Sequence, residues 1–477
     1  MLSCPSGVWG VLRLLILNIR GFGGLHTMEK TTLLQNHHFC VVGAGLVGCL
    51  TALHLARHGA HITLVEKRPD LRRADISGGR SIAMSLSDRG FRALATVGLE
   101  DTVRAGTAPK TRRCVHLPDG SIGEQEYGRQ GQALWTVNRK TLNCVLLDGC
   151  VATGQMDLRF ETLLEEVDLE AGVLRVTGPD GRSTEINCNH VVGADGMNSR
   201  VRGALCAAGV MDEDITTLDY RYFEMEIPPT AEGGFALDPD GVHIWPRPEG
   251  LFVALPNQGG TFTGTLFFAK AGDNLFYEGR SHEDRVRDFV AAFTEVASLV
   301  PDHDAVIRKA PPSDIKAVRC HPWHLGERVC LMGDASHAIV PFFAMGMNTG
   351  FEDCTILDGL IEEFAGDISR IFPAFSERRK PCTDAILDLS LRNFVSIGRS
   401  ADPDYDRRWR LERRLWDLMP EHWTPLYPMI HFGHWPLDEV IAVNARQKEI
   451  LDALLAEFPE PPSDAGLAAR VKSLLAV

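Results

Sequence analysis

The sequence lacks any C-x-x-C stretch and any cluster of cysteines and histidines at the spacing of metal ligands, although it contains 12 cysteines among 477 residues. Without such a cluster, the usual cysteine-based metal sites are excluded, and we predict no bound metal. The scattered cysteines are typical of reduced, mostly buried thiols in a protein of a reducing compartment.

Basic residues are also scarce. Lysine and arginine total 49 against 63 acidic residues, which gives a formal net charge of -14. Proteins that bind nucleic acids neutralise phosphates with positive charge, so this balance argues against a nucleic-acid partner.

Long apolar runs are absent as well. No uninterrupted apolar stretch reaches about 18 residues, so we predict no transmembrane helix. The apolar segment Val8–Ile19 is too short to span a bilayer, and it is either a targeting segment or an extension before Met28. Residues 1–37 are therefore set apart from the fold. We expect a cytoplasmic protein, with mitochondrial association as the alternative if this segment is a targeting signal.

A strand-helix-strand unit begins at His38. An apolar strand over 39–43 precedes a helix over 46–58 and a second strand over 61–66, and Gly59 stands where a helix end favours glycine. The turn between strand and helix reads G-A-G-L-V-G, from Gly43 to Gly48. Such glycines permit a tight turn, let a diphosphate approach the backbone, and pack helix on strand.

This unit predicts a dinucleotide site. The N-terminal amides and dipole of the helix would face the diphosphate, and Glu66 at the end of the second strand could accept hydrogen bonds from ribose hydroxyls. The candidate cofactor-binding residues here are Gly43, Gly45, Leu46, Val47, Gly48, Glu66 and Lys67.

Two later segments follow apolar runs. The stretch 191–196 (VVGADG) contains Asp195, and the stretch 328–334 (RVCLMGD) ends in Gly333 and Asp334. Either could be a strand followed by a surface turn. Together, and in this order after the glycine motif, they resemble the fingerprints of FAD-dependent aromatic hydroxylases, which implies that Asp334 binds the ribityl chain of FAD.

Between about His38 and His434 the sequence resembles the kynurenine 3-monooxygenase family. The matching segments are Gly79–Ile82, Ser87–Gly90, Val115–His116, Tyr127–Arg129, Asn138–Arg139, His243–Pro246, Ala254–Asn257, Phe262–Thr263 and Gly333–Phe343. The resemblance implies 3-hydroxylation of L-kynurenine in tryptophan catabolism, with FAD as cofactor and NADPH and O2 as co-substrates. No second dinucleotide motif is visible for NADPH.

The resemblance also implies roles for individual residues. Arg80 and Arg139 would help to bind FAD, and Asp195 belongs to the second fingerprint. Pro341, Gly346, Met347 and Asn348 would face the flavin, where Pro341, Gly346 and Asn348 are the candidate catalytic positions. A glycine lets backbone approach the flavin ring closely, and a helix that opens there would stabilise negative charge on it. His337 is expected to pack or form hydrogen bonds beside the flavin, because hydroxylation needs no base.

The substrate residues that the resemblance implies are Arg113, Tyr127, Asn393 and Tyr427. Arg113 suits a carboxylate because its guanidinium is planar and stays charged. Its neighbour Arg112 could equally supply that charge. Tyr127 and Tyr427 are two of only 6 tyrosines, and a buried aromatic with a satisfied hydroxyl is the alternative for each.

The sequence departs from the family at Ala344-Met345, where glycine and glutamine are usual. Since that glutamine would lie near flavin and substrate, a hydroxylase of another carboxylate-bearing aromatic stays an alternative. A non-catalytic FAD-binding protein is a second one. Met345 and Met347 could line a pocket or belong to the core. The C-terminal region carries charges and prolines where animal relatives have an apolar membrane anchor.

The overall prediction is an α/β fold. Strand-like runs between 217 and 268 indicate a mostly antiparallel sheet inserted into a Rossmann-like FAD-binding domain of the para-hydroxybenzoate-hydroxylase type. Helices are expected at 348–364 and from 369 onward, with breaks at 402–404, 419–420 and 460–464. We assign residues 1–37 to an extension, 38–210 and 310–370 to the FAD-binding domain, 211–309 to the substrate domain and 371–477 to a C-terminal helical region. A homodimer is a further expectation.

Overall fold

The computed structural model describes residues 31–73, 83–270, 280–309, 312–398, 403–458 and 462–475. Arg80 and the rest of the Gly79–Ile82 stretch lie outside these ranges, as do residues 1–30. Within the described part of the chain, no helix is both long and apolar enough to cross a membrane.

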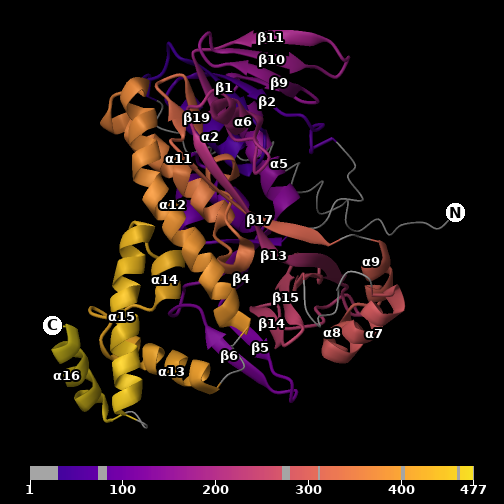
Figure 1. Ribbon diagram of the computed structural model, residues 1–477, viewed down its shortest axis with the longest axis vertical. Coiled ribbons are helices and arrows are strands. Elements are labelled where there is room, and N and C mark those ends of the chain that lie inside the picture. The colour runs from indigo at the N-terminus through magenta and orange to yellow at the C-terminus, as the bar shows by residue number, and fades with distance from the viewer. Residues whose placement is uncertain are drawn as a thin grey trace.

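A six-stranded sheet forms the upper part of the molecule in Figure 1. Its order is β18 (His324–Leu325), β19 (Val329–Leu331), β12 (His190–Gly193), β1 (His38–Val42), β2 (His61–Val65) and β8 (Met156–Arg159). All pairs are parallel except β18 with β19. The inner strands are almost wholly buried, as their continuous apolar sequences require when helices cover both faces.

Helices surround this sheet. Around it lie α2 (Leu46–Arg57), α5 (Arg139–Ala152), α6 (Arg200–Ala207) and α11 (Gly346–Glu363). Helix α2 packs against β1 and β2 and also against α5 and α11. The predicted strand-helix-strand unit and the helix predicted over 348–364 are thus confirmed within one or two residues. Gly59 has a φ of 87°, as a left-handed residue at the end of α2.

Smaller elements extend this part of the molecule. A three-stranded sheet of β9 (Leu163–Asp168), β10 (Val173–Thr177) and β11 (Ser183–Asn187) caps the top of the view in Figure 1. A second one consists of β3 (Ala83–Leu86), β7 (Leu134–Asn138) and β4 (Ala108–Lys110), next to α3 (Asp88–Thr96) and α4 (Glu100–Ala105).

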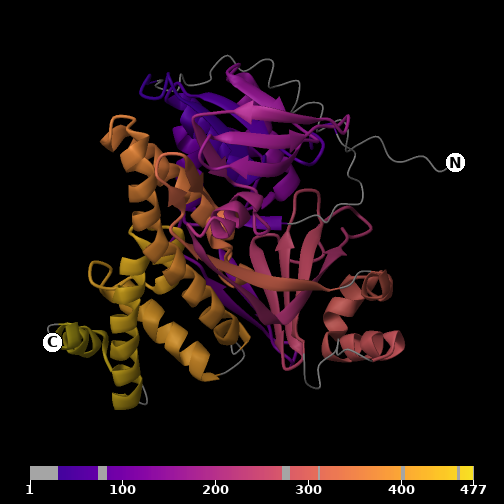
Figure 2. The ribbon, with the colours of Figure 1, turned by 45° about the horizontal axis from the view of Figure 1, so that its top comes forward.

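A seven-stranded sheet lies below and is seen best in Figure 2. Its order is β17 (Ser313–His321), β13 (Asp212–Ile227), β16 (Phe262–Ala269), β15 (Gly250–Pro256), β14 (Gly241–Arg247), β5 (Arg112–His116) and β6 (Ile122–Glu126). Every pair is antiparallel except β14 with β5. The predicted antiparallel sheet is confirmed, and β5, β6 and β17 join it from other parts of the sequence.

One apolar cluster binds this sheet to three short helices. The helices are α7 (His282–Ala292), α8 (Thr294–Leu299) and α9 (His303–Lys309). Trp245 and Phe252 of the sheet pack in this cluster with Phe289 and Phe293 of the helical segment, and all four are buried. This face of the sheet is therefore buried against the three helices, and the opposite face is available for other contacts.

The C-terminal region is helical. It consists of α12 (Ile368–Gly398), α13 (Pro403–Leu418), α14 (Leu426–His431), α15 (Leu437–Glu457) and α16 (Asp464–Leu475). Helix α12 contacts β18 of the upper sheet and β14 and β17 of the lower sheet, so it bridges the two (Figure 1). The predicted break at 419–420 falls between α13 and α14. The breaks predicted at 402–404 and 460–464 lie partly outside the described residues and partly at the starts of α13 and α16. The break between α14 and α15 was not predicted from the sequence.

The turn between β1 and α2 yields a stability prediction. A Cβ atom at position 48 would lie 1.9 Å from the carbonyl oxygen of Gly43, whereas a Cβ at position 45 meets nothing within 4 Å. Gly48→Ala should therefore lower the free energy of unfolding by about 3 kcal/mol or more, because backbone must move. Gly45→Ala should cost less than about 1 kcal/mol.

Urea unfolding of the two apoprotein variants measures this difference without a contribution from cofactor affinity. Equal unfolding midpoints for the two variants would contradict the turn geometry.

Candidate functional site

Four predicted residues meet at one edge of the six-stranded sheet. Gly43 follows β1, Glu66 follows β2, Asp195 follows β12, and Asp334 follows β19. Because these strands are parallel, their carboxyl ends lie on the same side. Ligands of open α/β sheets bind outside that edge, so the structure places all three sequence motifs around one candidate cofactor site.

The glycine turn has the geometry of a diphosphate cradle. Gly43 has a φ of 102°, and a Cβ there would lie 2.5 Å from the carbonyl oxygen of Ala194. Gly45 is the N-cap residue of α2, makes no side-chain cap, and faces open space. The amides of the first helical turn have no partners inside the helix, so an anion can approach them where a side chain would block the way.

Val47 has a packing role in this region. A Cβ at Gly333 would lie 3.0 Å from the Val47 Cγ2 atom, and one at Gly350 would lie 2.6 Å from it. The valine thus fits between two glycines, one after β19 and one on α11. Leu46 is buried in the main core. These contacts fix the start of α2 against the third motif.

Glu66 is buried and already holds the turn in place. Its carboxylate accepts hydrogen bonds from the Ala44 amide at 2.9 Å and from the Arg68 amide and Nε at 2.9 and 2.8 Å. Burial opposes ionisation, but these donors, chiefly Arg68, lower the pKa of Glu66 below its ordinary value. The carboxylate is therefore charged and oriented beside the candidate ribose position. Lys67 is exposed next to it.

Asp195 supports the start of helix α6, whose N-cap residue is Ser199. Its carboxylate accepts hydrogen bonds from the Ser199 hydroxyl at 2.5 Å and the Arg200 amide at 2.7 Å. Burial nevertheless raises its pKa. The nearby Arg202 is buried and donates to Glu213 and to the carbonyl oxygens of Met197 and Ala335. This arginine ties the second motif to the segment after the third.

Asp334 is exposed at the edge of the six-stranded sheet. Solvent reaches its side chain, although its neighbours Gly333 and Ala335 are buried and the surrounding protein raises its pKa. The charges of His337 and Arg139 oppose that rise. Arg139 is exposed at the start of α5 and forms no ion pair with the described residues. Asp334 and Arg139 are thus both exposed and close enough to interact, so both could contact an elongated polar cofactor such as FAD.

A buried carboxylate supports the third motif from behind. Asp353 of α11 accepts hydrogen bonds from the Gly333 amide at 3.1 Å and Arg379 Nε at 2.8 Å, and its Oδ2 lies 2.6 Å from His337 Nε2. Burial favours the protonated form, but His337 and Arg379 lower the pKa of Asp353. His337 is buried beside Trp323. It therefore serves to position the motif and is not open to solvent.

The segment Pro341–Asn348 follows the third motif in the sequence. We call it the flavin-side segment, because the family resemblance predicts that it faces the flavin. Pro341 and Ala344 are exposed, and Gly346 is the first residue of α11. Asn348 is fully buried and is held by the Ser87 amide and the carbonyl oxygens of Ser85 and Ala344. The segment therefore exposes Pro341 and Ala344 to solvent on a backbone fixed by Asn348.

Met345 and Met347 belong to the core, which settles the alternative left open by the sequence. Met345 is fully buried with Phe343, Ile386 and Met429, and Met347 packs in the main core. Neither is among the described residues that line the large cavity. Of the two readings of Met345, the structure therefore favours core packing, because its side chain lies in one apolar cluster with Phe343.

A cavity of about 700 Å³ lies between the lower sheet and the C-terminal helices. All four predicted substrate residues line it: Arg113, Tyr127, Asn393 and Tyr427. They come from β5, the end of β6, α12 and α14. The cavity also receives Phe343 from the flavin-side segment, so it connects the two halves of the candidate site.

Arg113 and Arg112 point to different partners, as successive residues of a strand must. Arg112 forms an ion pair with Asp238. Arg113 has no carboxylate partner among the described residues, and its guanidinium carbon lies 5.8 Å from the ring centres of both Tyr127 and Tyr427. Of the two arginines, Arg113 is the one whose charge is available to a ligand in the cavity.

The two tyrosines stack on each other, with ring centres 4.8 Å apart. Burial raises the pKa of both hydroxyls, and Arg113 only partly opposes this effect. Both phenols therefore stay protonated at neutral pH and can donate hydrogen bonds. Together with the guanidinium, they form a donor set that suits a carboxylate.

The remaining cavity residues are held by local contacts. Asn393 donates to the carbonyl oxygen of Phe342 at 2.8 Å, which ties α12 to the flavin-side segment. Behind the cavity, His431 stacks on Phe343 with ring centres 5.5 Å apart. Complete burial and the charges of Arg89 and Arg113 lower the pKa of His431 to about 3, so it packs as a neutral ring.

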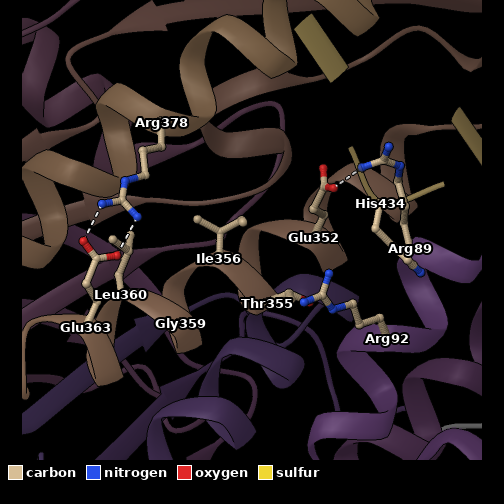
Figure 3. A pocket seen from close by; sticks show the side chains of 10 residues that line it. All are labelled: Arg89, Arg92, Glu352, Thr355, Ile356, Gly359, Leu360, Glu363, Arg378 and His434. Carbon is tan, nitrogen blue, oxygen red and sulfur yellow. Dashed lines mark hydrogen bonds and ion pairs between the residues drawn. The ribbon is translucent and has the colours of Figure 1, made fainter. Parts of the chain in front are cut away.

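Arg89 fastens helix α14 to the rest of the site. It donates to the carbonyl oxygens of Ile430 and Trp435, both at 2.7 Å, and pairs with Glu352 of α11. Figure 3 shows this pair at the wall of a separate cleft of about 230 Å³. Glu352 in turn accepts from Arg379 at 2.8 Å. A chain of charged side chains thus links α14 to Asp353.

The sequence did not single out several residues that build this site. They are Asp353, Arg379, Glu352, His431 and Tyr405. Asp353 lies in a helix whose spacing of apolar residues predicts only a buried apolar face. Its partner Arg379 lies 26 residues away in another helix. No local pattern signals such a pairing. The scarcity of tyrosine could have drawn attention to Tyr405.

The backbone at Ala344 yields a second stability prediction. Its φ of 54° lies in the left-handed region, where a side chain costs about 1–2 kcal/mol relative to glycine. Ala344→Gly should therefore raise the free energy of unfolding by up to about 1 kcal/mol after the entropy of the unfolded chain is included. The matched control is Ala442→Gly, at an exposed position of α15. It should lower the free energy of unfolding by about 1 kcal/mol.

Urea unfolding of both variants with FAD present checks this pair. A loss of stability in Ala344→Gly comparable with that of the control would contradict the strain at position 344.

Comparisons with known proteins agree with this arrangement. A family model described as "FAD binding domain" matches residues 37–390. The chain is 37% identical to the kynurenine 3-monooxygenase of Stenotrophomonas maltophilia, covering 87% of this chain and 91% of that protein. It is 36% identical to the kynurenine 3-monooxygenase of Flavobacterium johnsoniae, covering 87% and 93%.

Solved structures support the fold. The 2-methyl-3-hydroxypyridine-5-carboxylic acid oxygenase aligns with a TM-score of 0.63 at 21% identity, over 77% of this chain and 93% of that one. The p-nitrophenol 4-monooxygenase PnpA of Pseudomonas putida aligns with a TM-score of 0.62 at 18% identity, over 89% and 99%. The predicted fold class, with its FAD-binding domain and inserted sheet, is confirmed. The chain belongs to the kynurenine 3-monooxygenase family of FAD-dependent flavoprotein monooxygenases.

Proposed function

We propose that this enzyme uses NADPH and O2 to hydroxylate L-kynurenine at ring position 3, with FAD as its cofactor. The observation that carries the proposal is the cavity at Arg113. There, a guanidinium without a carboxylate partner among the described residues lies against two protonated tyrosines, beside Phe343 of the flavin-side segment. The kynurenine 3-monooxygenases that the chain resembles make an amino-acid substrate the first choice.

The residues at the sheet edge fit FAD. The amides after Gly45 would hold the diphosphate, Glu66 the adenosine ribose, and Asp334 with Arg139 the ribityl region. The reduced cofactor supplies the activation of O2 for transfer to an electron-rich ring. The protein needs no acid-base pair for that transfer. Its residues bind the ring in the right orientation and exclude water.

The cavity residues would fix the orientation of the substrate. Arg113, Tyr127 and Tyr427 would bind its carboxylate, which places the aromatic ring toward Phe343 and the exposed backbone at Pro341 and Ala344. Asn393 supports the same segment through the Phe342 carbonyl. The aniline nitrogen of kynurenine donates electron density to the neighbouring ring carbon, and that carbon is the one to be hydroxylated.

A hydroxylase for another carboxylate-bearing aromatic is the second candidate. The motivation is the departure at Ala344-Met345. Met345 packs in the core and does not line the cavity. The departure is therefore weaker evidence for another substrate than the sequence alone suggested. The homodimer, the cytoplasmic location and the mitochondrial alternative stay predictions.

Flavin reduction tests the proposed substrate. FAD-loaded protein is mixed anaerobically with NADPH, with and without L-kynurenine, and the loss of flavin absorbance is followed. We expect kynurenine to accelerate the reduction at least tenfold, since the family couples coenzyme oxidation to the presence of substrate. If kynurenine has no effect but another aromatic carboxylate accelerates reduction, the second candidate replaces the first.

The two neighbouring arginines provide a matched pair of variants. Arg113→Ala should raise the KM for kynurenine about 100-fold, equivalent to about 3 kcal/mol for a charge-assisted bidentate contact, while FAD stays bound. Arg112→Ala removes an equal charge from the same strand but breaks only the pairs with Asp238 and Glu124, and should change the KM less than about twofold. Similar KM values in the two variants would remove Arg113 from the substrate site.

A further inference from the structure

Three of the charged side chains that line the large cavity form ion pairs: Glu126, Arg408 and Arg413. Glu126 bonds Arg413 at 2.8 Å, and Arg408 pairs with Asp452. Lys448 and Arg392 are exposed at the cavity surface. Glu412, in contrast, is partly buried in the lining and forms no hydrogen bond or ion pair with the described residues. Among the described residues of the lining, Arg113 and Glu412 are therefore the half-buried cation and anion that have no oppositely charged partner.

Helix α13 holds Glu412 on the side that faces the cavity. Tyr405, Arg408, Glu412 and Trp416 follow one another at helical spacing and all line it. The helix is fixed next to Tyr127, because Arg413 also donates to the carbonyl oxygen of Gly128 at 2.9 Å.

The surroundings of Glu412 leave its charge uncompensated. Burial raises the pKa of its carboxyl to about 7, and Arg408 opposes this only in part. A carboxylate in this position is destabilised until a cation or hydrogen-bond donor reaches it. Arg408 does not meet this need, since its guanidinium is paired with Asp452. A cationic ligand group in the cavity would meet it.

We propose that Glu412 binds the α-ammonium group of the substrate whose carboxylate lies on Arg113. This inference rests on the proposed function and assigns a further binding residue for its amino-acid substrate. The ammonium and carboxylate groups of an amino acid are bonded to the same carbon atom. They therefore suit a cavity whose described lining offers a cation at Arg113 and an anion at Glu412, neither with an oppositely charged partner. The pair would reject aromatic carboxylates that lack the ammonium group, because Glu412 would then stay buried without a partner.

Two ligands that differ only in the ammonium group test the proposal. They are L-kynurenine and its desamino analogue, 4-(2-aminophenyl)-4-oxobutanoate, which keeps the ring, aniline, ketone and carboxylate. Steady-state KM values and rates of anaerobic flavin reduction are measured for the wild type and Glu412→Gln at about pH 8, where the Glu412 carboxyl is ionised. Glu421→Gln is the matched control, since Glu421 is exposed and does not line the cavity.

For kynurenine, Glu412→Gln should raise the KM about tenfold, as expected for the loss of one charge-assisted hydrogen bond. For the desamino analogue the KM should change less than twofold, and Glu421→Gln should match the wild type with both ligands. Bound FAD per protein should be equal in all three proteins, which excludes misfolding as the cause.

Two results would overturn the inference, and they differ in their consequence for the proposed function. If Glu412→Gln raises the KM equally for both ligands, or for neither, Glu412 does not read the ammonium group, while the proposed function stands. If the wild type responds to neither ligand, the proposed function fails and the inference fails with it.

Discussion

The carboxylate of Asp353 is the buried charge on which the geometry of both halves of the site depends. It holds the Gly333 amide and His337 at the flavin side and pairs with Arg379. Arg379 reaches Glu352, which pairs with Arg89, and Arg89 bonds two carbonyl groups around α14. Breaking a buried pair of this kind leaves an uncompensated charge at a cost of about 3–5 kcal/mol. The network therefore keeps Tyr427 of α14 and the third cofactor motif in a fixed relation.

Much of the cofactor side could be predicted from the sequence, since its signals are local. Gly43 to Gly48, Asp195 and Asp334 each follow an apolar strand, and parallel strands bring such residues to one edge. The choice between Arg112 and Arg113 could not be made, because it depends on which face of β5 meets the cavity once β14 pairs with that strand. Helix α13 could not be placed either, because its contacts with β6 and Gly128 join distant parts of the chain.

The departure at Ala344-Met345 has a simple physical reading. Ala344 adopts a left-handed backbone that favours glycine, and Met345 fills an apolar cluster behind Phe343. The substitution thus changes backbone strain and packing behind the cavity wall and leaves the polar lining as it is. We therefore attribute the proposed substrate selectivity to the charged groups of the lining, at Arg113 on β5 and Glu412 on α13.

The central claim is that oxygen from O2 enters the ring of kynurenine. Turnover under ¹⁸O2, with mass spectrometry of the product and parallel measurement of NADPH consumption, tests it most directly. The account predicts 3-hydroxykynurenine that carries one ¹⁸O atom for each NADPH oxidised. Oxidation of NADPH with release of hydrogen peroxide and recovery of unchanged kynurenine would contradict it.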